Sequence, residues 1–220
     1  MELKDIDKEE IENLLFKIES SFDIKFGDTE LAHVTTFGEL CDIITNKIKL
    51  ENTYDCTTQQ AFYKLRNAVT DIFQVDKKTV STDMLLSDLL PRKDRKTKIK
   101  QLETKLGYKL NILRPPHWIT STLIFLFVAG LVGLFVNFKI GLIILAISVV
   151  GLRISKELGN EIDLETFGQL VERMTRENYL KVRRNPETYN KTEIENIITD
   201  LFADFYDLDK SKLKRDATFV

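Results

Sequence analysis

The longest run of hydrophobic residues in the chain lies at 118–154. Its first part, 118–138, has 21 residues without a charged side chain, and its second part, 140–152, has 13. A helix needs about 20 apolar residues to cross the hydrocarbon core of a bilayer. The first part therefore predicts a transmembrane helix. The second part crosses only if Arg153 and Lys156 extend their charged ends to the membrane interface.

A short polar sequence, Asn-Phe-Lys at 137–139, separates the two parts and predicts a tight turn between two antiparallel helices. The alternative is a buried helical hairpin inside a soluble protein. Soluble helices of this length normally carry a polar stripe, and 118–154 carries none, so a membrane hairpin is the favoured interpretation. Trp118 directly follows Pro-Pro-His, where an aromatic residue is expected to anchor a span at the interface.

Outside this run, apolar residues recur at the three- and four-residue spacing that is typical of amphipathic helices. The segments with this spacing are 8–22, 36–48, 58–75, 92–106, 163–174 and 191–206, and a short helical piece is also expected at 28–32. Thr36 and Glu39 form a potential capping box, and Gly107 is suited to end a helix in the left-handed conformation. The sequence therefore predicts an all-α fold.

Several short sequences recur in distant parts of the chain, which indicates an internal repeat. Thr-Phe-Gly-Glu-Leu at 36–40 returns as Thr-Phe-Gly-Gln-Leu at 166–170. The recurring pairs are 36–40 with 166–170, 16–26 with 100–110, and 69–83 with 198–216. We therefore expect the same small helical unit twice.

The recurring segments resemble the acyl carrier protein fold, a small four-helix bundle. The likeness lies in hydrophobic-Asp-Lys after a first helix (75–77 and 208–210), Glu-x-x-Phe-x-Ile at the end of a second (19–24), and Thr-Thr-hydrophobic-x-x-Leu at the start of a last (35–40). The resemblance implies a circularly permuted bundle from 1–50 with 190–220, and a second bundle from 57–112 with 162–178. The transmembrane hairpin, 118–155, is inserted in the second bundle.

The apolar stripe of the segment 191–206 must be buried against another element. Packing against the N-terminal helices of the same chain would bury it and complete the permuted bundle. Exchange of the segment between two chains would bury it equally well and give a domain-swapped homodimer.

A working acyl carrier protein attaches 4′-phosphopantetheine to a serine at the start of its second helix. In this chain Lys8 and Arg92 occupy the two corresponding positions, and neither side chain can form the phosphodiester. Ser87 lies five residues before Arg92 and is disfavoured as an acceptor. The resemblance therefore implies carrier-like units without this cofactor.

The distribution of charge predicts a topology. Of the 220 residues 30% are charged, the formal net charge is −2, and this balance offers no argument for nucleic-acid binding. Lysine and arginine gather at 91–117 and again after the hairpin, at Arg153, Lys156, Arg173, Arg176, Lys181, Arg183 and Arg184, whereas the turn has only Lys139. The positive-inside rule then places both termini in the cytoplasm. The polar, acidic start predicts no cleavable signal peptide.

The residues expected at the membrane interface are Arg114, Trp118, Arg153 and Lys156. The basic segment 92–109 could lie against anionic headgroups or could only set the topology, and both interpretations stay open. Catalytic and metal-binding patterns are not found. His33, His117, Cys41 and Cys56 lack metal-ligand spacing, and both cysteines are expected in the core.

These patterns predict an integral membrane protein with two spans that is not an enzyme. We expect a non-catalytic, carrier-like module, anchored in the bilayer, that docks a protein partner at the cytoplasmic surface and belongs to lipid or acyl metabolism. The alternative is a structural or regulatory subunit of a larger membrane enzyme or transporter.

Overall fold

The structure is a computed structural model in which residues 8–27 and 29–219 are described. Contacts divide the chain into two compact units. Unit 1 is Met1–Ser81 with Gly168–Val220, and unit 2 is Thr82–Phe167. Helices form nearly all of the described regular structure, and each strand has only two residues. The predicted all-α class is therefore confirmed.

Unit 1 contains most of the helices outside the hairpin. They are α1 (Lys8–Phe22), α2 (Phe37–Lys47), α3 (Thr57–Phe73), α8 (Phe167–Glu177, whose first residue belongs to unit 2), α9 (Tyr179–Val182), α10 (Lys191–Tyr206) and the 3-10 turn η1 (Lys210–Lys212). Strand β1 (Glu51–Asn52) pairs in parallel with β4 (Thr188–Tyr189).

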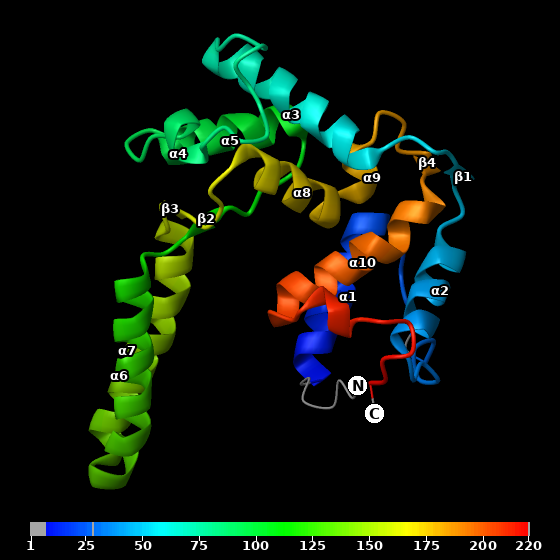
Figure 1. The fold of residues 1–220 in the computed structure, drawn as a ribbon. Helices are drawn as coiled ribbons and strands as arrows, with labels where there is room; N and C mark the ends of the chain where they lie inside the picture. Colours follow the sequence, from blue (N-terminus) through cyan, green and yellow to red (C-terminus); the bar gives the residue numbers. More distant parts are fainter. Residues whose placement is uncertain (1–7, 28, 220) are drawn as a thin grey trace. The chain divides into compact units, whose positions relative to one another are not determined.

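The core of unit 1 forms where α10 packs against α1 and α2 of the same chain (Figure 1). Ile194, Ile198 and Leu201 of α10 are buried, as its apolar stripe predicts. Phe202 lies edge-on against Phe37 of α2, with ring centroids 5.2 Å apart. Burying such a side chain contributes about 1.5–3 kcal/mol, so α10 is a major source of stability for the N-terminal helices.

The C-terminal segment also pairs with the start of α2. The Phe37 N–H donates to the Ala217 carbonyl oxygen at 2.8 Å, and the Phe219 N–H donates to the Thr35 carbonyl oxygen at 3.0 Å. These bonds satisfy backbone groups that a helix start would otherwise leave without partners. The C-terminal segment is therefore joined to the start of α2 within unit 1.

Unit 2 contains the hydrophobic hairpin and a short helical part. Its elements are α4 (Leu86–Leu89), α5 (Arg95–Leu106), β2 (Leu113–Arg114), α6 (His117–Val136), α7 (Phe138–Leu158) and β3 (Glu161–Ile162). Strands β2 and β3 are antiparallel and directly flank the hairpin helices in sequence.

Two predicted helix ends are confirmed. Thr36 accepts a hydrogen bond from the Glu39 N–H, and the Glu39 carboxylate accepts one from the Thr36 N–H, so the capping box is formed. Gly107 ends α5 with φ of 83° in the left-handed region.

Three local predictions are wrong. Residues 29–33 form successive turns instead of a helix, because bonds such as Ala32 N–H to the Thr29 oxygen close turns of four residues. Helix α5 begins at Arg95 instead of 92, because Pro91 accepts from the Asp94 N–H in a preceding turn. Helix α9 and strand β4 lie in the segment 175–190, where no element was predicted.

The segments of the first predicted bundle lie in one unit, whereas those of the second lie in both units. The segments 1–50 and 190–220 both belong to unit 1. The segments 57–112 and 162–178 draw on both units, because α3 is grouped with unit 1 and α5 with unit 2. Helix α3 contacts α9 within unit 1.

Candidate functional site

Helices α6 and α7 form an antiparallel hairpin that is long and apolar enough to span a membrane. The two helices have 20 and 21 residues, and only 6% and 11% of their most apolar windows are buried within the protein. A core helix of a soluble protein would be mostly buried. Large apolar side chains such as Phe125, Phe135 and Ile143 are instead exposed.

Close approach of the two helices depends on glycine. A Cβ atom at Gly141 would lie 2.4 Å from the Leu134 nitrogen, so only glycine fits there. At Gly133 a Cβ atom would lie 3.4 Å from Gly141, an ordinary contact distance. Small residues of this kind let membrane helices pack backbone to backbone.

The turn between the helices is made by Asn137. Its side-chain oxygen accepts from the Lys139 N–H at 3.2 Å and the Ile140 N–H at 3.3 Å, so Asn137 is the N-cap of α7. The predicted turn is therefore confirmed, and α7 is longer than its 13-residue apolar run because it continues to Leu158.

The open end of the hairpin is closed by a small structure that we call the neck: β2, β3, residues 159 and 160, the turn at 91–94, the first turn of α5 and the last two turns of α7 (151–158). Leu113 pairs with Ile162, and Arg114 pairs with Glu161. A Cβ atom at Gly159 would lie 2.5 Å from the Arg114 carbonyl carbon, so a residue with a side chain does not fit at this position.

The first turn of α5 is bonded to the end of α7 through basic side chains. The Lys96 Nζ donates to the Leu158 carbonyl oxygen at 2.7 Å. The guanidinium of Arg95, which is buried, donates to the Leu90 and Asn160 carbonyl oxygens. These cations satisfy carbonyl groups at a helix C-terminus, where the helix dipole favours positive charge.

The predicted interface residues lie at the neck or at the adjoining helix ends. Trp118, in the first turn of α6, is 71% exposed. Arg153 and Lys156, in the last turns of α7, are also exposed. Arg114 forms an ion pair with Asp163, with Nε and Oδ2 3.0 Å apart.

The two positions of the carrier serine have different surroundings. Arg92 lies in the turn before α5 and forms an ion pair with Glu161 of β3. Lys8 is the first residue of α1, and its side chain lies outside the described part of the structure. Ser87 of α4 is exposed, and its hydroxyl oxygen lies 3.4 Å from an Asp88 carboxylate oxygen.

The cysteines differ from each other. Cys41 is buried, as predicted, and burial raises the pKa of its thiol from 9.0 to about 12. Cys56 is exposed, so its predicted core position is wrong; it precedes α3 at the surface. His33 lies in an exposed turn, and His117 is the exposed first residue of α6. Among residues 8–27 and 29–219, no group of three His, Cys, Asp or Glu could hold a metal ion.

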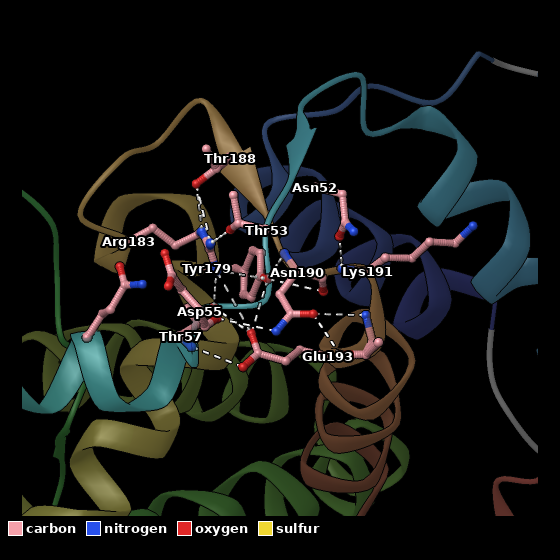
Figure 2. A network of polar contacts seen from close by, with 12 residues as sticks. Asn52, Thr53, Asp55, Thr57, Tyr179, Arg183, Thr188, Asn190, Lys191 and Glu193 are labelled. Atoms are coloured by element: carbon pink, nitrogen blue, oxygen red, sulfur yellow. Dashed lines mark hydrogen bonds and ion pairs between the residues drawn. The ribbon is translucent and has the colours of Figure 1, made fainter.

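A polar network in unit 1 surrounds a buried arginine (Figure 2). Arg183 is 1% exposed. Its Nη2 donates to the Thr53 hydroxyl at 2.7 Å and to the Thr188 hydroxyl at 3.3 Å. Its Nη1 donates to the hydroxyls of Thr57 and Tyr179. In the sequence, Arg183 counted only among the positive charges that predict the topology, and nothing there indicated that this side chain is buried inside unit 1.

Glu193 balances this buried charge from α10. Its Oε2 lies 4.0 Å from the Arg183 Nη1, and its carboxylate accepts from the Thr57 N–H at 3.0 Å. It therefore also caps the start of α3. A buried ion requires such compensation, since desolvation costs several kcal/mol per charge. The network ties β1, α3, α9, β4 and α10 together, which indicates a structural role.

A cavity of about 290 Å³ lies beside this network. It is lined by Gln60, Tyr63, Lys64, Asn67, Val182, Arg183 and Arg184. Burial lowers the pKa of Lys64, whose ammonium donates to the Lys181 carbonyl oxygen. The Gln60 side-chain oxygen accepts from the Arg184 N–H at 2.6 Å. The lining groups thus largely bond to the protein itself.

Comparison with known proteins adds no family: no family model, no curated protein and no solved structure matches this chain. Function must therefore be argued from the hairpin, its neck and the helical units.

Proposed function

We propose that this chain is a membrane-anchored, non-catalytic docking module. In this proposal α6 and α7 span the bilayer, both termini are cytoplasmic, and the carrier-like helical units bind a protein partner at the membrane surface in lipid or acyl metabolism. The observation that carries the proposal is the hairpin, whose two helices of 20 and 21 residues expose their apolar side chains.

The orientation is supported by the charges at the two ends of the hairpin. Lys139 is the charged residue of the turn. The neck end has Arg92, Lys96, Arg153 and Lys156, which are exposed. Positive charge favours the cytoplasmic side of a membrane, which supports a cytoplasmic position for the neck, unit 1 and the part of unit 2 outside the hairpin.

The carrier-like repeat is supported first by two matching backbone bridges. Thr36 pairs with Thr218, and Thr166 pairs with Leu85, both as isolated antiparallel bridges. The next residue is a phenylalanine at both places. The Phe37 N–H donates to the Ala217 carbonyl oxygen and the Phe167 N–H donates to the Met84 carbonyl oxygen, both at 2.8 Å. The recurring sequence Thr-Phe-Gly therefore has the same local geometry at both places.

The ends of α3 and α10 also match. Their C-caps, Gln74 and Asp207, are both left-handed, with φ of 55° and 50°. Two residues later, Asp76 and Asp209 each accept a hydrogen bond at 2.9 Å from the N–H two positions onward. These turns correspond to the hydrophobic-Asp-Lys pattern.

A third match joins α1 and α5. The carboxylates of Glu19 and Glu103 accept from the N–H seven residues onward at 2.7 and 2.8 Å. Four residues after each glutamate, Asp23 and Gly107 have positive φ of 50° and 83°. Together the three matches support the proposal that one local framework occurs twice.

Membrane insertion is tested by alkaline extraction of membranes that contain the full chain. We expect the protein to stay with the bilayer. In a cysteine-free background, Lys139→Cys should react with a membrane-impermeant maleimide only from the side opposite Lys212→Cys. Extraction into the alkaline supernatant would refute the anchor, and labelling of both from one side would refute the topology.

Docking is tested by isolating the chain from detergent-solubilised membranes and identifying bound proteins. A soluble partner that is retained when the hairpin is exchanged for an unrelated one would support the docking module. A partner that is lost on this exchange would favour the alternative of a subunit in a larger membrane complex. Radiolabelled pantetheine on the purified protein would refute the non-catalytic proposal.

A further inference from the structure

We propose that the neck binds the headgroups of anionic phospholipids through a cluster formed by Lys93, Lys96, Arg153 and Lys156, here called the neck cluster. This inference rests on the proposed membrane insertion of α6 and α7. It goes beyond anchoring because it assigns a lipid class and a binding surface.

The contacts of the neck bring the four cations to one end of the hairpin. Arg153 and Lys156 belong to the last turns of α7. Lys96 belongs to the first turn of α5 and is bonded to Leu158 at the end of α7. Lys93 lies in the turn beside Arg92, whose carbonyl oxygen accepts from the Asn160 side chain at 3.0 Å.

The acidic residues of the neck strands are already paired. Glu161 contacts Arg92 and also Arg95, whose Nη1 lies 3.8 Å from its carboxylate. Asp163 pairs with Arg114. Asp94 and Glu157 are the remaining acidic residues in the two turns that hold the neck cluster. Four cations against two carboxylates leave this surface positive.

The exposed cations are available to a ligand. Lys93, Arg153 and Lys156 are exposed, and none of the residues in the described part of the chain forms an ion pair with them. The segment 92–100 makes the electrostatic potential around the cluster more positive, since it contains six lysines or arginines and one aspartate. A phosphate group is the anion that matches such a surface.

The hairpin determines that this phosphate belongs to a lipid. If α6 and α7 span the bilayer, Trp118 and the neck cluster lie at the level of the headgroups, where each lysine or arginine contributes about 1 kcal/mol of attraction to an anionic surface. The cluster lies at an exposed helix end, and its position against the bilayer follows from the fold of unit 2.

The single tryptophan allows a direct test. The full chain is reconstituted in vesicles of phosphatidylcholine with a minority of phosphatidylglycerol, and bromine is placed on the acyl chains of one lipid or the other. We expect brominated phosphatidylglycerol to quench Trp118 fluorescence beyond its share of the bilayer, and added salt to reduce this excess. Quenching in proportion to the bilayer composition would overturn the inference.

Variants identify the surface. The triple variant Lys93→Gln, Arg153→Gln and Lys156→Gln should lower the relative association constant for phosphatidylglycerol by about fivefold for each removed charge. The charge-conserving variant Lys93→Arg, Arg153→Lys and Lys156→Arg should retain the preference. A matched control, Lys77→Gln, Lys78→Gln and Lys212→Gln, neutralises three exposed lysines of unit 1 and should leave it unchanged. An unchanged preference in the first variant would overturn the assignment.

The same experiment separates the two proposals. If bromine on neither lipid quenches Trp118, the hairpin does not enter the bilayer, and the proposed function fails together with this inference. If both lipids quench in proportion to their amounts, the hairpin is inserted and only the lipid preference is refuted.

Discussion

At the scale of single residues, Arg183 shows how one buried charge organises several segments. Its guanidinium donates to hydroxyl groups of residues before and after α3 in the sequence, and Glu193 offers it an opposite charge. The surrounding hydroxyls replace the hydrogen bonds that water would provide. Removing this side chain should therefore leave several buried acceptors without donors.

We predict that Arg183→Met lowers the free energy of unfolding by about 2–3 kcal/mol, because an unsatisfied buried polar group costs about 1–3 kcal/mol. Urea denaturation of the full chain in detergent micelles, followed by circular dichroism, measures the change. Arg184→Met is the matched control at an exposed position and should change stability by less than about 0.5 kcal/mol. Equal effects of the two substitutions would contradict the role of the network.

The two cysteines should differ in reactivity. Burial raises the pKa of the Cys41 thiol to about 12, so at pH 8 it stays protonated as well as inaccessible. Cys56 is exposed. We predict one rapid modification by maleimide in the native protein, at Cys56, and a second only after unfolding. The Cys56→Ser variant serves as the control, and fast labelling of that variant would show that Cys41 is not buried.

The same shift has a consequence at high pH. Because the folded-state pKa of Cys41 lies above its ordinary value of 9.0, the contribution of this group to stability is complete below about pH 9. It is then lost as the pH rises toward 12, since the unfolded chain ionises first.

At the scale of elements, the structure depends on helix ends as much as on helix faces. The capping box starts α2, Asn137 starts α7, and basic side chains of α5 bond to the end of α7. Each of these contacts satisfies backbone groups that the helix itself cannot. The capping box can be tested by substitution.

The Glu39 cap should make the stability of the protein depend on pH in the acidic range. Hydrogen bonds from the Thr35 N–H and the Thr36 N–H lower the pKa of the Glu39 carboxyl below its ordinary value of 4.5. Its contribution to stability is therefore present above about pH 4.5 and is lost as the pH falls through the lower, folded-state pKa. We predict that Glu39→Gln reduces the loss of stability between pH 5 and pH 3.

Unfolding free energies across this pH range measure that effect. Glu12→Gln, at an exposed position of α1, is the comparison. A Glu39→Gln protein with the same acid dependence as the wild type would show that the cap does not contribute.

Close packing of the hairpin should depend on Gly141. We predict that Gly141→Ala separates α6 and α7 and costs about 1–3 kcal/mol, because a methyl group has no room beside Leu134. Gly133→Ala, where a Cβ atom makes an ordinary contact, should be tolerated. Distances between spin labels at the exposed positions Ile124 and Ile147 report the separation. Unchanged distances for Gly141→Ala would refute the packing.

At the scale of the whole molecule, unit 1 is assembled from both ends of the sequence. Helix α10 packs on α1 and α2 within one chain, and the segment after it pairs with the start of α2. The sequence left two ways to bury the apolar stripe of α10 open, packing within one chain or exchange between two chains. In this structure the stripe is buried within one chain.

We predict that deleting 191–220 exposes the N-terminal segment to proteolysis, because the core of unit 1 loses the side chains of α10. Ile198→Asp should have the same effect through a single buried charge. Asn196→Asp introduces the same group at an exposed position of α10 and should be harmless. Limited proteolysis of the full chain measures all three. Protease resistance of 12–48 that survives the deletion would refute the dependence.

Much of this organisation could be predicted from local patterns. The 3.6-residue periodicity located α1, α2, α3 and α10 to within a few residues, because an amphipathic stripe records which face is buried. The apolar run predicted α6 and α7 through its length and its lack of charged side chains. The short helix α9 was not predicted, because four residues are too few to show a helical periodicity of apolar side chains.

The sequence alone determined most of the helices, the hairpin, the capping box of α2 and the glycine end of α5, because each of these depends on residues within a few turns of one another. Only the tertiary structure decided that Arg183 is buried and that α5 is bonded to the end of α7. Thr53 and Thr57 are 130 and 126 residues from Arg183, and Lys96 is 62 residues from Leu158. Contacts over such distances leave no local pattern, since the folded chain brings the partners together.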